Sequence, residues 1–129
     1  MVGTEIIHLD THVLVYLFEG EVNRLGAAAR KAIDRHDAVA SAAAVLELEF
    51  LHEIGRLKPT ASKLMSTLGA DIGLRVCDLA FRTVVEQALA ESWTRDPFDR
   101  LIVANAKAAR APLVTRDERI RGHYARALW

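Results

Sequence analysis

The chain has 129 residues, of which 51% are hydrophobic and 26% are charged. This balance is typical of a compact globular protein and excludes an intrinsically disordered one. The 17 Lys and Arg residues are matched by 17 Asp and Glu residues, which argues against a protein that coats nucleic acid through uniform positive charge. The single Cys77 excludes an internal disulfide and a cysteine-based metal cluster.

Length and hydropathy also limit the organisation of the chain. No apolar run approaches the ~20 residues that span a bilayer, and no signal-peptide pattern opens the sequence. We therefore expect one domain covering residues 1–129, located in the cytoplasm and without contact to a membrane.

The first predicted elements are a strand and the helix that follows it. Residues 5–9 (EIIHL) form an apolar, β-branched run that predicts a buried strand. Asp10 stands at the carboxyl end of this strand, where it can cap a helix over residues 11–18. An alanine-rich helix is expected from Asn23 to about Arg35, and a short strand at residues 38–40.

A well-marked helix follows from Ser41, its predicted cap, to about Gly55. At 100° per residue, Glu47 falls in the middle of the apolar face, which is made by Ala43, Ala44, Leu48, Phe50, Leu51 and Ile54. A buried carboxylate without partners costs several kcal/mol or takes up a proton. Glu47 therefore either serves chemistry or pairs with a buried arginine.

The second half of the chain continues to alternate helices and strands. Helices are expected from Lys58-Pro59-Thr60 to about residue 72 and over residues 79–91, with strands at residues 73–77 and 111–115. The tail at residues 123–129 is expected to pack back on the sheet. Such alternation indicates an α/β fold with a mostly parallel sheet and helices on both faces.

The stretch 94–109 (TRDPFDRLIVANAKAA) predicts a helix with two carboxylates at its start. Asp96 is suited to the cap and Pro97 to the first helical position. Asp99 then lies in the first turn, beside the positive end of the helix dipole. The same spacing also fits a variant of the capping box, which needs no chemistry.

Four acids are expected to meet at one edge of the sheet. Ligands of open α/β sheets bind beyond the carboxyl ends of the strands, where Asp10 and Asp117 follow predicted strands. Asp99 and Glu47 can reach the same edge from the first turns of their helices. A cap is again the alternative role for Asp117.

Four carboxylates repel one another unless a cation lies between them. Ligation by oxygen alone favours Mg²⁺ or Mn²⁺, which can activate water and hold a phosphodiester oxygen. Thr11 and Thr115 can orient ligands from behind the acids, and Arg95 and Arg116 can contact the phosphates of RNA.

These blocks together carry a resemblance to a known family. Leu9-Asp10-Thr11-His12, Ser41 with Glu47 six residues later, residues 95–102 (RDPFDRLI) and Thr115-Arg116-Asp117 look like a PIN-domain nuclease. Within that superfamily the chain most resembles the VapC toxins of bacterial toxin–antitoxin pairs, essentially from end to end.

The resemblance implies a three-layer α/β/α sandwich and an endoribonuclease that needs Mg²⁺ or Mn²⁺. It implies cleavage of structured RNA such as tRNA or rRNA, a homodimer, and inhibition by an antitoxin whose tail occupies the acidic groove. By position, the family's acidic quartet falls on Asp10, Glu47, Asp99 and Asp117, and Asp96 matches an accessory acid.

Alternatives remain open at this point. A phosphatase of the haloacid dehalogenase type needs a second aspartate where this chain has His12. A receiver domain needs an acidic pair near the first strand, where Asp10 stands alone. A stand-alone RNA-processing PIN nuclease and a PIN fold kept only for binding are the other possibilities.

Overall fold

A computed structural model gives the structure of residues 5–129. The strands are β1 (Ile6–Leu9), β2 (Asp37–Ala40), β3 (Arg75–Val76), β4 (Leu113–Val114) and β5 (Ala127–Leu128). The helices are α1 (Thr11–Phe18), α2 (Ala27–Arg35), α3 (Ala42–Glu53), α4 (Ala61–Ile72), α5 (Phe81–Ala88), α6 (Pro97–Ala108) and α7 (Glu118–His123), with a short 3-10 helix at Val22–Arg24.

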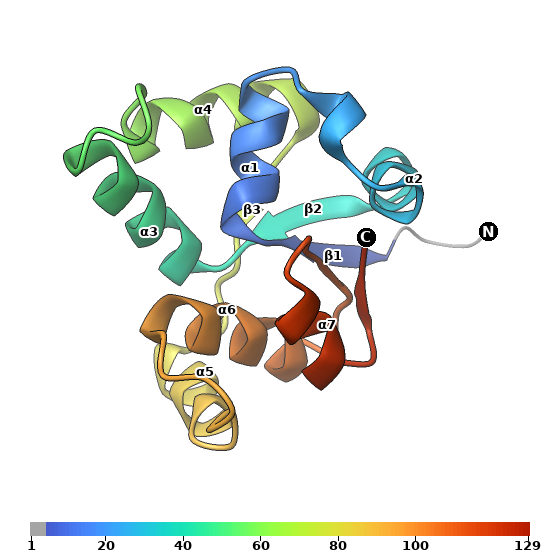
Figure 1. Cartoon of the computed structure of the whole chain (residues 1–129), viewed down its shortest axis with the longest axis vertical. Coiled ribbons are helices and arrows are strands. Elements are labelled where there is room, and N and C mark those ends of the chain that lie inside the picture. The colour runs from blue at the N-terminus through green and yellow to red at the C-terminus, as the bar shows by residue number, and fades with distance from the viewer. Residues whose placement is uncertain (1–4) are drawn as a thin grey trace.

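The strands of the described residues form one sheet in the order β3-β2-β1-β4-β5. Every neighbouring pair is parallel. Helices α1 to α4 lie above the strands in Figure 1, and α5 to α7 lie below them. The predicted α/β fold, a sandwich with a parallel sheet between two helical layers, is confirmed.

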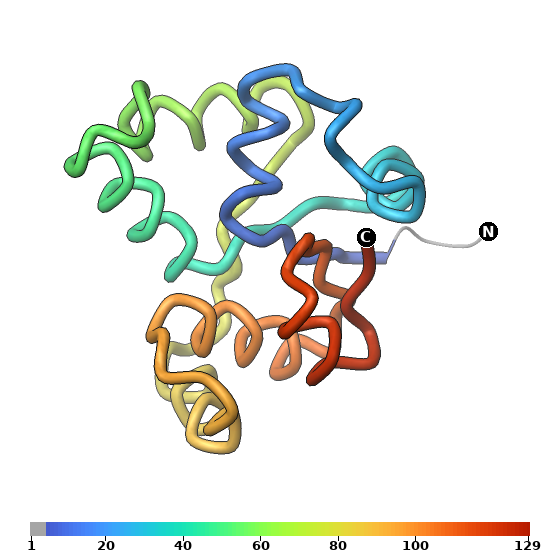
Figure 2. The backbone as a smooth tube through the Cα atoms, in the orientation of Figure 1, coloured from blue at the N-terminus to red at the C-terminus, as the bar shows by residue number. Residues whose placement is uncertain are grey.

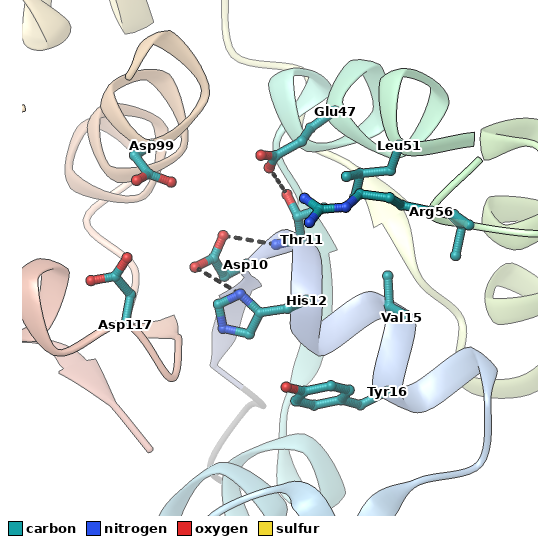
Figure 3. A pocket seen from close by; sticks show the side chains of 11 residues that line it. Asp10, Thr11, His12, Val15, Tyr16, Glu47, Leu51, Arg56, Asp99 and Asp117 are labelled. Carbon is teal, nitrogen blue, oxygen red and sulfur yellow. Dashed lines mark hydrogen bonds and ion pairs between the residues drawn. The ribbon is translucent and has the colours of Figure 1, made fainter. Parts of the chain in front are cut away.

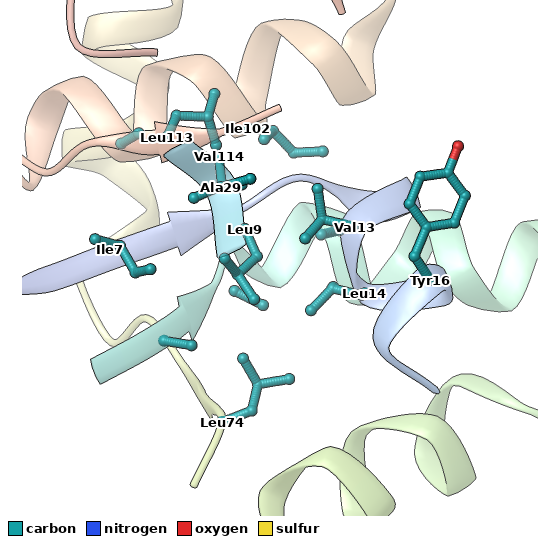
Figure 4. Close-up of a cluster of buried hydrophobic side chains, with 14 of the residues drawn as sticks. Ile7, Leu9, Val13, Leu14, Tyr16, Ala29, Leu74, Ile102, Leu113 and Val114 are labelled. Atoms are coloured by element: carbon teal, nitrogen blue, oxygen red, sulfur yellow. The ribbon is translucent and has the colours of Figure 1, made fainter. Parts of the chain in front are cut away.

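The core lies on both faces of the central strands. Ile7 and Leu9 of β1 are at most 1% exposed, and Leu113 of β4 is fully buried. Val13 and Leu14 of α1 cover this cluster from one layer, as Figure 4 shows. Burial of a branched side chain stabilises the fold by roughly 1.5–3 kcal/mol, so these strands hold the central position because their sequences are apolar.

Three helices begin at the carboxyl edge of the sheet, and each is capped by a residue that comes shortly after the end of a strand. Asp10 caps α1, Ser41 caps α3 and Asp117 caps α7. Asp96 caps α6, with Pro97 at the first helical position, as predicted. Cap chemistry therefore places the start of four helices around one end of the sheet.

Some element predictions were wrong in detail. The helix expected from Asn23 starts only at Ala27, because Gly26 lies against the backbone of Trp129 and the 3-10 helix precedes it. The tail does more than pack on the sheet, since β5 adds a strand beside β4. The Ala29 N–H donates to the Trp129 carbonyl oxygen at 3.1 Å, and Figure 2 shows the C-terminal segment ending close to α2.

The predicted apolar face of α3 was also partly wrong. Phe50 and Ile54 are 50% and 52% exposed, whereas Ala44 and Leu48 are fully buried. Glu49 of the same helix accepts a hydrogen bond from the Ala61 N–H at 3.0 Å and so helps to begin α4. None of the helices in residues 5–129 is long and apolar enough to cross a membrane.

Candidate metal-binding active site

The four predicted acids line one pocket of about 310 Å³. Figure 3 shows Asp10 and Glu47 on one side of it and Asp99 and Asp117 on the other, with their carboxylates directed into the space between. They come from the end of β1, from α3, from the first turn of α6 and from the cap of α7. The structure therefore brings together residues that are up to 107 positions apart in the sequence, from Asp10 to Asp117.

Asp10 is the most buried of the four acids, with 3% of its surface exposed. Its Oδ1 accepts a hydrogen bond from the Thr11 N–H at 2.8 Å, and its Oδ2 accepts one from the Thr115 hydroxyl at 2.6 Å. The Thr115 oxygen in turn accepts from the Asp117 N–H at 3.1 Å. Thr115 thus joins two of the acids and fixes the spacing between β1 and the start of α7.

Glu47 is held by a single hydrogen bond, in which the Thr11 hydroxyl donates to its Oε1. Within residues 5–129 it has no ion pair, so the alternative of a buried Glu–Arg pair was wrong. Burial raises the pKa of Glu47, the hydrogen bond from Thr11 lowers it, and the neighbouring carboxylates of Asp10 and Asp96 raise it further. A bound proton or a nearby cation would offset the cost of burying this charge and its repulsion by the neighbouring carboxylates.

Asp99 carries the largest electrostatic strain in the pocket. Burial, followed by the charges of Asp96, Asp10, Asp117 and Glu47, raises its pKa from 3.8 to about 7. Because every other acid of the cluster repels its charge, a cation placed among these carboxylates would stabilise the ionised form of Asp99. Near neutral pH this carboxyl is only partly ionised unless a cation is bound.

Asp96 and Asp117 both use Oδ1 to cap a helix. Asp96 accepts from the N–H groups of Phe98 and Asp99 at 2.9 and 3.1 Å. Asp117 accepts from those of Arg119 and Ile120 at 2.8 and 3.1 Å. Asp117 lines the pocket, and its Oδ2 accepts no hydrogen bond from the residues that the structure describes, whereas Asp96 is exposed outside the lining residues. Both aspartates therefore cap helices, as the alternative interpretation predicted. Asp117 caps its helix and lines the pocket at the same time.

The four carboxylates are suitable ligands for a hard divalent cation, although their oxygens are not yet close enough together to coordinate one. All four acids offer carboxylate oxygens, which suit Mg²⁺ or Mn²⁺. Within the described residues no three Asp, Glu, His or Cys side chains are grouped so that they could hold a metal as they stand. Mutual repulsion keeps bare carboxylates apart, so a bound cation is expected to draw them inward.

The two arginines expected to contact RNA are placed differently. Arg116 lies beside the pocket: its backbone N–H donates to His12 Nε2 at 3.1 Å, and its Nη1 donates to the Tyr16 hydroxyl at 2.9 Å. Arg95 is exposed and donates from Nη1 to the Ser92 carbonyl at 2.7 Å, away from the lining residues. Arg116 thus borders the pocket and lines a neighbouring hollow with Asp117, whereas Arg95 lines neither.

Sequence reasoning missed three polar residues that line the pocket, namely His12, Tyr16 and Arg56. His12 and Tyr16 lie one turn apart on α1 and share the contact with Arg116, a pairing that i, i+4 spacing alone suggests. No local signal marks Arg56, because its place in the pocket depends on the fold of the turn between α3 and α4.

Glu91, the last residue of the helix predicted over residues 79–91, is 2% exposed. It accepts hydrogen bonds from Lys107 at 2.8 and 3.1 Å, from Trp93 Nε1 at 2.9 Å and from Gln87 at 3.0 Å. This network fixes the turn that leads from α5 to Asp96. It therefore positions the start of α6, and with it Asp99.

The fold and the acidic pocket define a class of protein, which comparison with known proteins identifies. The PIN domain family matches residues 7–125, so the chain belongs to this family. It is similar to ribonuclease VapC22 of Mycobacterium tuberculosis (strain ATCC 25618 / H37Rv), with 37% identity over 119 residues that cover 89% of each protein. The resemblance expected from the sequence is confirmed.

Solved structures with the same fold include toxin–antitoxin complexes. VapBC2 from Rickettsia felis, bound to a DNA fragment from their promoter, matches with a TM-score of 0.66 and 17% identity over 91% of this chain and 92% of that one. A toxin–antitoxin complex from Klebsiella pneumoniae matches with a TM-score of 0.64 and 16% identity over 95% and 96%. At these identities the likeness concerns the fold.

Proposed function

We propose that the protein is the toxin of a bacterial toxin–antitoxin pair and acts as a metal-dependent endoribonuclease on structured cellular RNA such as tRNA or rRNA. The observation that carries this proposal is the convergence of Asp10, Glu47, Asp99 and Asp117 on one pocket. Membership of the PIN domain family and the similarity to a ribonuclease over most of the chain support it.

In this proposal the four carboxylates hold Mg²⁺ or Mn²⁺, and the bound ion supplies an activated water and charge stabilisation at the phosphate. Asp10 is suited to be the fixed ligand, because Thr11 and Thr115 already hold both of its oxygens in place. Thr11 also orients Glu47. Arg116, held by Tyr16, binds a phosphate of the substrate, since a guanidinium can donate two hydrogen bonds to phosphate oxygens.

The proposed antitoxin inhibits by placing a cation in the pocket. An arginine side chain would replace the charge of the metal between the four carboxylates and gain charge-assisted hydrogen bonds. Co-purification from the native operon tests this partner. A protein that is isolated alone and active from that operon would contradict the toxin assignment and leave a stand-alone RNA-processing nuclease.

The proposed homodimer has a suitable apolar surface. Leu46 and Phe81 are 62% and 69% exposed, and with Phe98 and Leu101 they line an apolar pocket of about 230 Å³ beside the acidic one. Exposed apolar patches of this kind mark interaction sites. Light scattering after chromatography should give a dimer for the wild type and a monomer for Leu46→Glu.

The enzymatic proposal is tested by incubating purified protein with tRNA and rRNA. Cleavage should require Mg²⁺ or Mn²⁺ and stop in EDTA. Asp10→Asn should reduce the rate by orders of magnitude, because an amide is a poor ligand for a hard cation. Undiminished cleavage in EDTA would overturn the metal mechanism, and absence of cleavage with either ion would overturn the ribonuclease assignment.

A further inference from the structure

Arg56 places a positive charge on the wall of an acidic pocket. It lies on the turn between α3 and α4 and lines the same pocket as Asp10 and Glu47. Figure 3 shows its side chain reaching from the turn toward Thr11 and Glu47. Nevertheless, the guanidinium makes no hydrogen bond or ion pair with any residue that the structure describes.

The turn that carries Arg56 is firmly held. Gly55 adopts a φ of 79°, a conformation that ends α3 and that glycine takes without strain. His52 Nδ1 lies 3.1 Å from the Leu57 carbonyl oxygen and 3.0 Å from that of Lys58. Leu57 is 6% exposed and anchors the turn in the core. The backbone of Arg56 is therefore fixed while its charged end stays free.

A guanidinium that forms no ion pair with the neighbouring carboxylates can bind an anionic ligand, while the carboxylates bind a metal ion. Glu47 takes its hydrogen bond from Thr11 rather than from Arg56, which leaves its charge available for a metal ion. The complementary ligand for Arg56 is then an anion that arrives with the metal. A phosphodiester meets that requirement, since it binds both a divalent cation and a guanidinium.

A second guanidinium lies at another side of the pocket. The Arg116 guanidinium donates to the Tyr16 hydroxyl and its backbone N–H donates to His12 Nε2, and these two residues of α1 line the pocket together with Arg56. An RNA strand that places one phosphate over the acids has neighbouring phosphates on either side. Because the acids lie in a recess, a single strand can reach them more easily than a stiff duplex.

We propose that Arg56 binds a phosphate next to the scissile one, so that a single RNA strand crosses the acidic pocket between Arg116 and Arg56. The inference rests on the proposed ribonuclease function and assigns Arg56 to substrate binding. Arg56 takes no part in holding the metal. Its removal therefore affects the affinity for RNA and leaves the affinity for Mn²⁺ intact.

The test compares Arg56→Gln and Arg56→Lys with the wild type. Binding of a fluorescent, mixed-sequence single-stranded RNA is measured by anisotropy at several salt concentrations, with Ca²⁺ replacing the active metal. Arg56→Gln should weaken binding about tenfold, the loss of one charge-assisted contact. It should also reduce the slope of log K against log salt by ~0.7, the value for one phosphate contact on a single strand. Arg56→Lys should keep the slope.

Two controls make the result specific. Lys58→Gln removes a charge from the same turn but outside the lining residues, and it should leave binding within about twofold of the wild type. Mn²⁺ affinity of Arg56→Gln, measured by calorimetry, should not fall below that of the wild type, because the variant loses only a charge that repels the cation. In cleavage assays KM should rise while kcat changes little.

Three outcomes would overturn the inference. An unchanged RNA affinity and salt slope in Arg56→Gln would show that Arg56 does not touch RNA. Tighter Mn²⁺ binding with faster cleavage would show that Arg56 competes with the metal. A wild type that cleaves neither this RNA nor tRNA and rRNA would remove the proposed function itself, whereas an active wild type with an unaffected variant would remove only the role of Arg56.

Discussion

Replacing Asp99 by asparagine should stabilise the metal-free protein at alkaline pH while abolishing cleavage. The pKa of Asp99 is raised from 3.8 to about 7, chiefly by burial and then by the neighbouring carboxylates. The unfolded chain loses this proton near pH 3.8, but the folded chain keeps it until about pH 7. Stability is therefore lost as the pH rises between these two values, and the full penalty is present above the higher one.

The size of the penalty follows from the shift. A change of this magnitude corresponds to ~4 kcal/mol if nothing reduces it. Asp99 is only half-buried, and solvent screening reduces such an interaction, so we expect ~1–2 kcal/mol. Asn cannot ionise, so the variant escapes the penalty while it keeps a side chain of the same shape.

Urea unfolding in EDTA measures the difference. Asp99→Asn should be more stable than the wild type at about pH 8 and equal to it at about pH 4. Asp71→Asn, which changes an exposed acid of α4 outside the pocket, should show no such dependence on pH. Added Mn²⁺ should stabilise the wild type more than the Asp99 variant, because only binding to the folded state raises stability. If Asp99→Asn is destabilising at every pH, the carboxyl serves the fold and the electrostatic reasoning is wrong.

Three further predictions concern residues outside the pocket. His8, 1% exposed, has its pKa lowered by burial from 6.5 to about 4. The unfolded chain therefore takes up a proton first on acidification, and the free energy of unfolding of the wild type, relative to that of His8→Leu, should fall by ~3 kcal/mol between pH 7 and pH 4 in urea unfolding. Lys107→Met should cost ~3–5 kcal/mol in the same assay, because it leaves the buried Glu91 charge without its cation; an effect below 1 kcal/mol would contradict the role of this pair. Gly26→Ala should lower the free energy of unfolding by ~1–3 kcal/mol, because a Cβ there would lie 2.5 Å from the carbonyl carbon of Trp129; a thermal melt equal to that of the wild type would show that the C-terminal residues can move aside.

The parts of the fold that local chemistry determines could be predicted from the sequence. The starts of α6 and α7 follow from Asp96-Pro97 and Asp117, because a cap depends on residues two or three positions away. The meeting of the four acids was predictable as well, since the carboxyl ends of parallel strands share one edge. Their roles as ligands remain a prediction.

The features that depend on tertiary contacts could not be predicted. Periodicity placed Phe50 on a buried face, but its ring lies 6.1 Å from that of Phe98 and half of the residue is exposed. Glu91 reads as a helix end because Lys107, its partner, lies 16 residues later. Arg56 enters the pocket only because the turn after α3 folds back toward α1.

The hydrogen bond between Thr115 and Asp10 has a consequence for the order in which the molecule is made. These residues are 105 positions apart, and β4, which pairs with β1, also comes late in the chain. During synthesis at ~5–20 residues per second, the first strand waits several seconds for the neighbour that completes the centre of the sheet. The helices α1 to α4 can pack before that moment, but the acidic pocket cannot. A chain that ends before Thr115 lacks both this hydrogen bond and Asp117, so under the proposed function the capacity to cleave RNA is acquired only when the last part of the chain has been made.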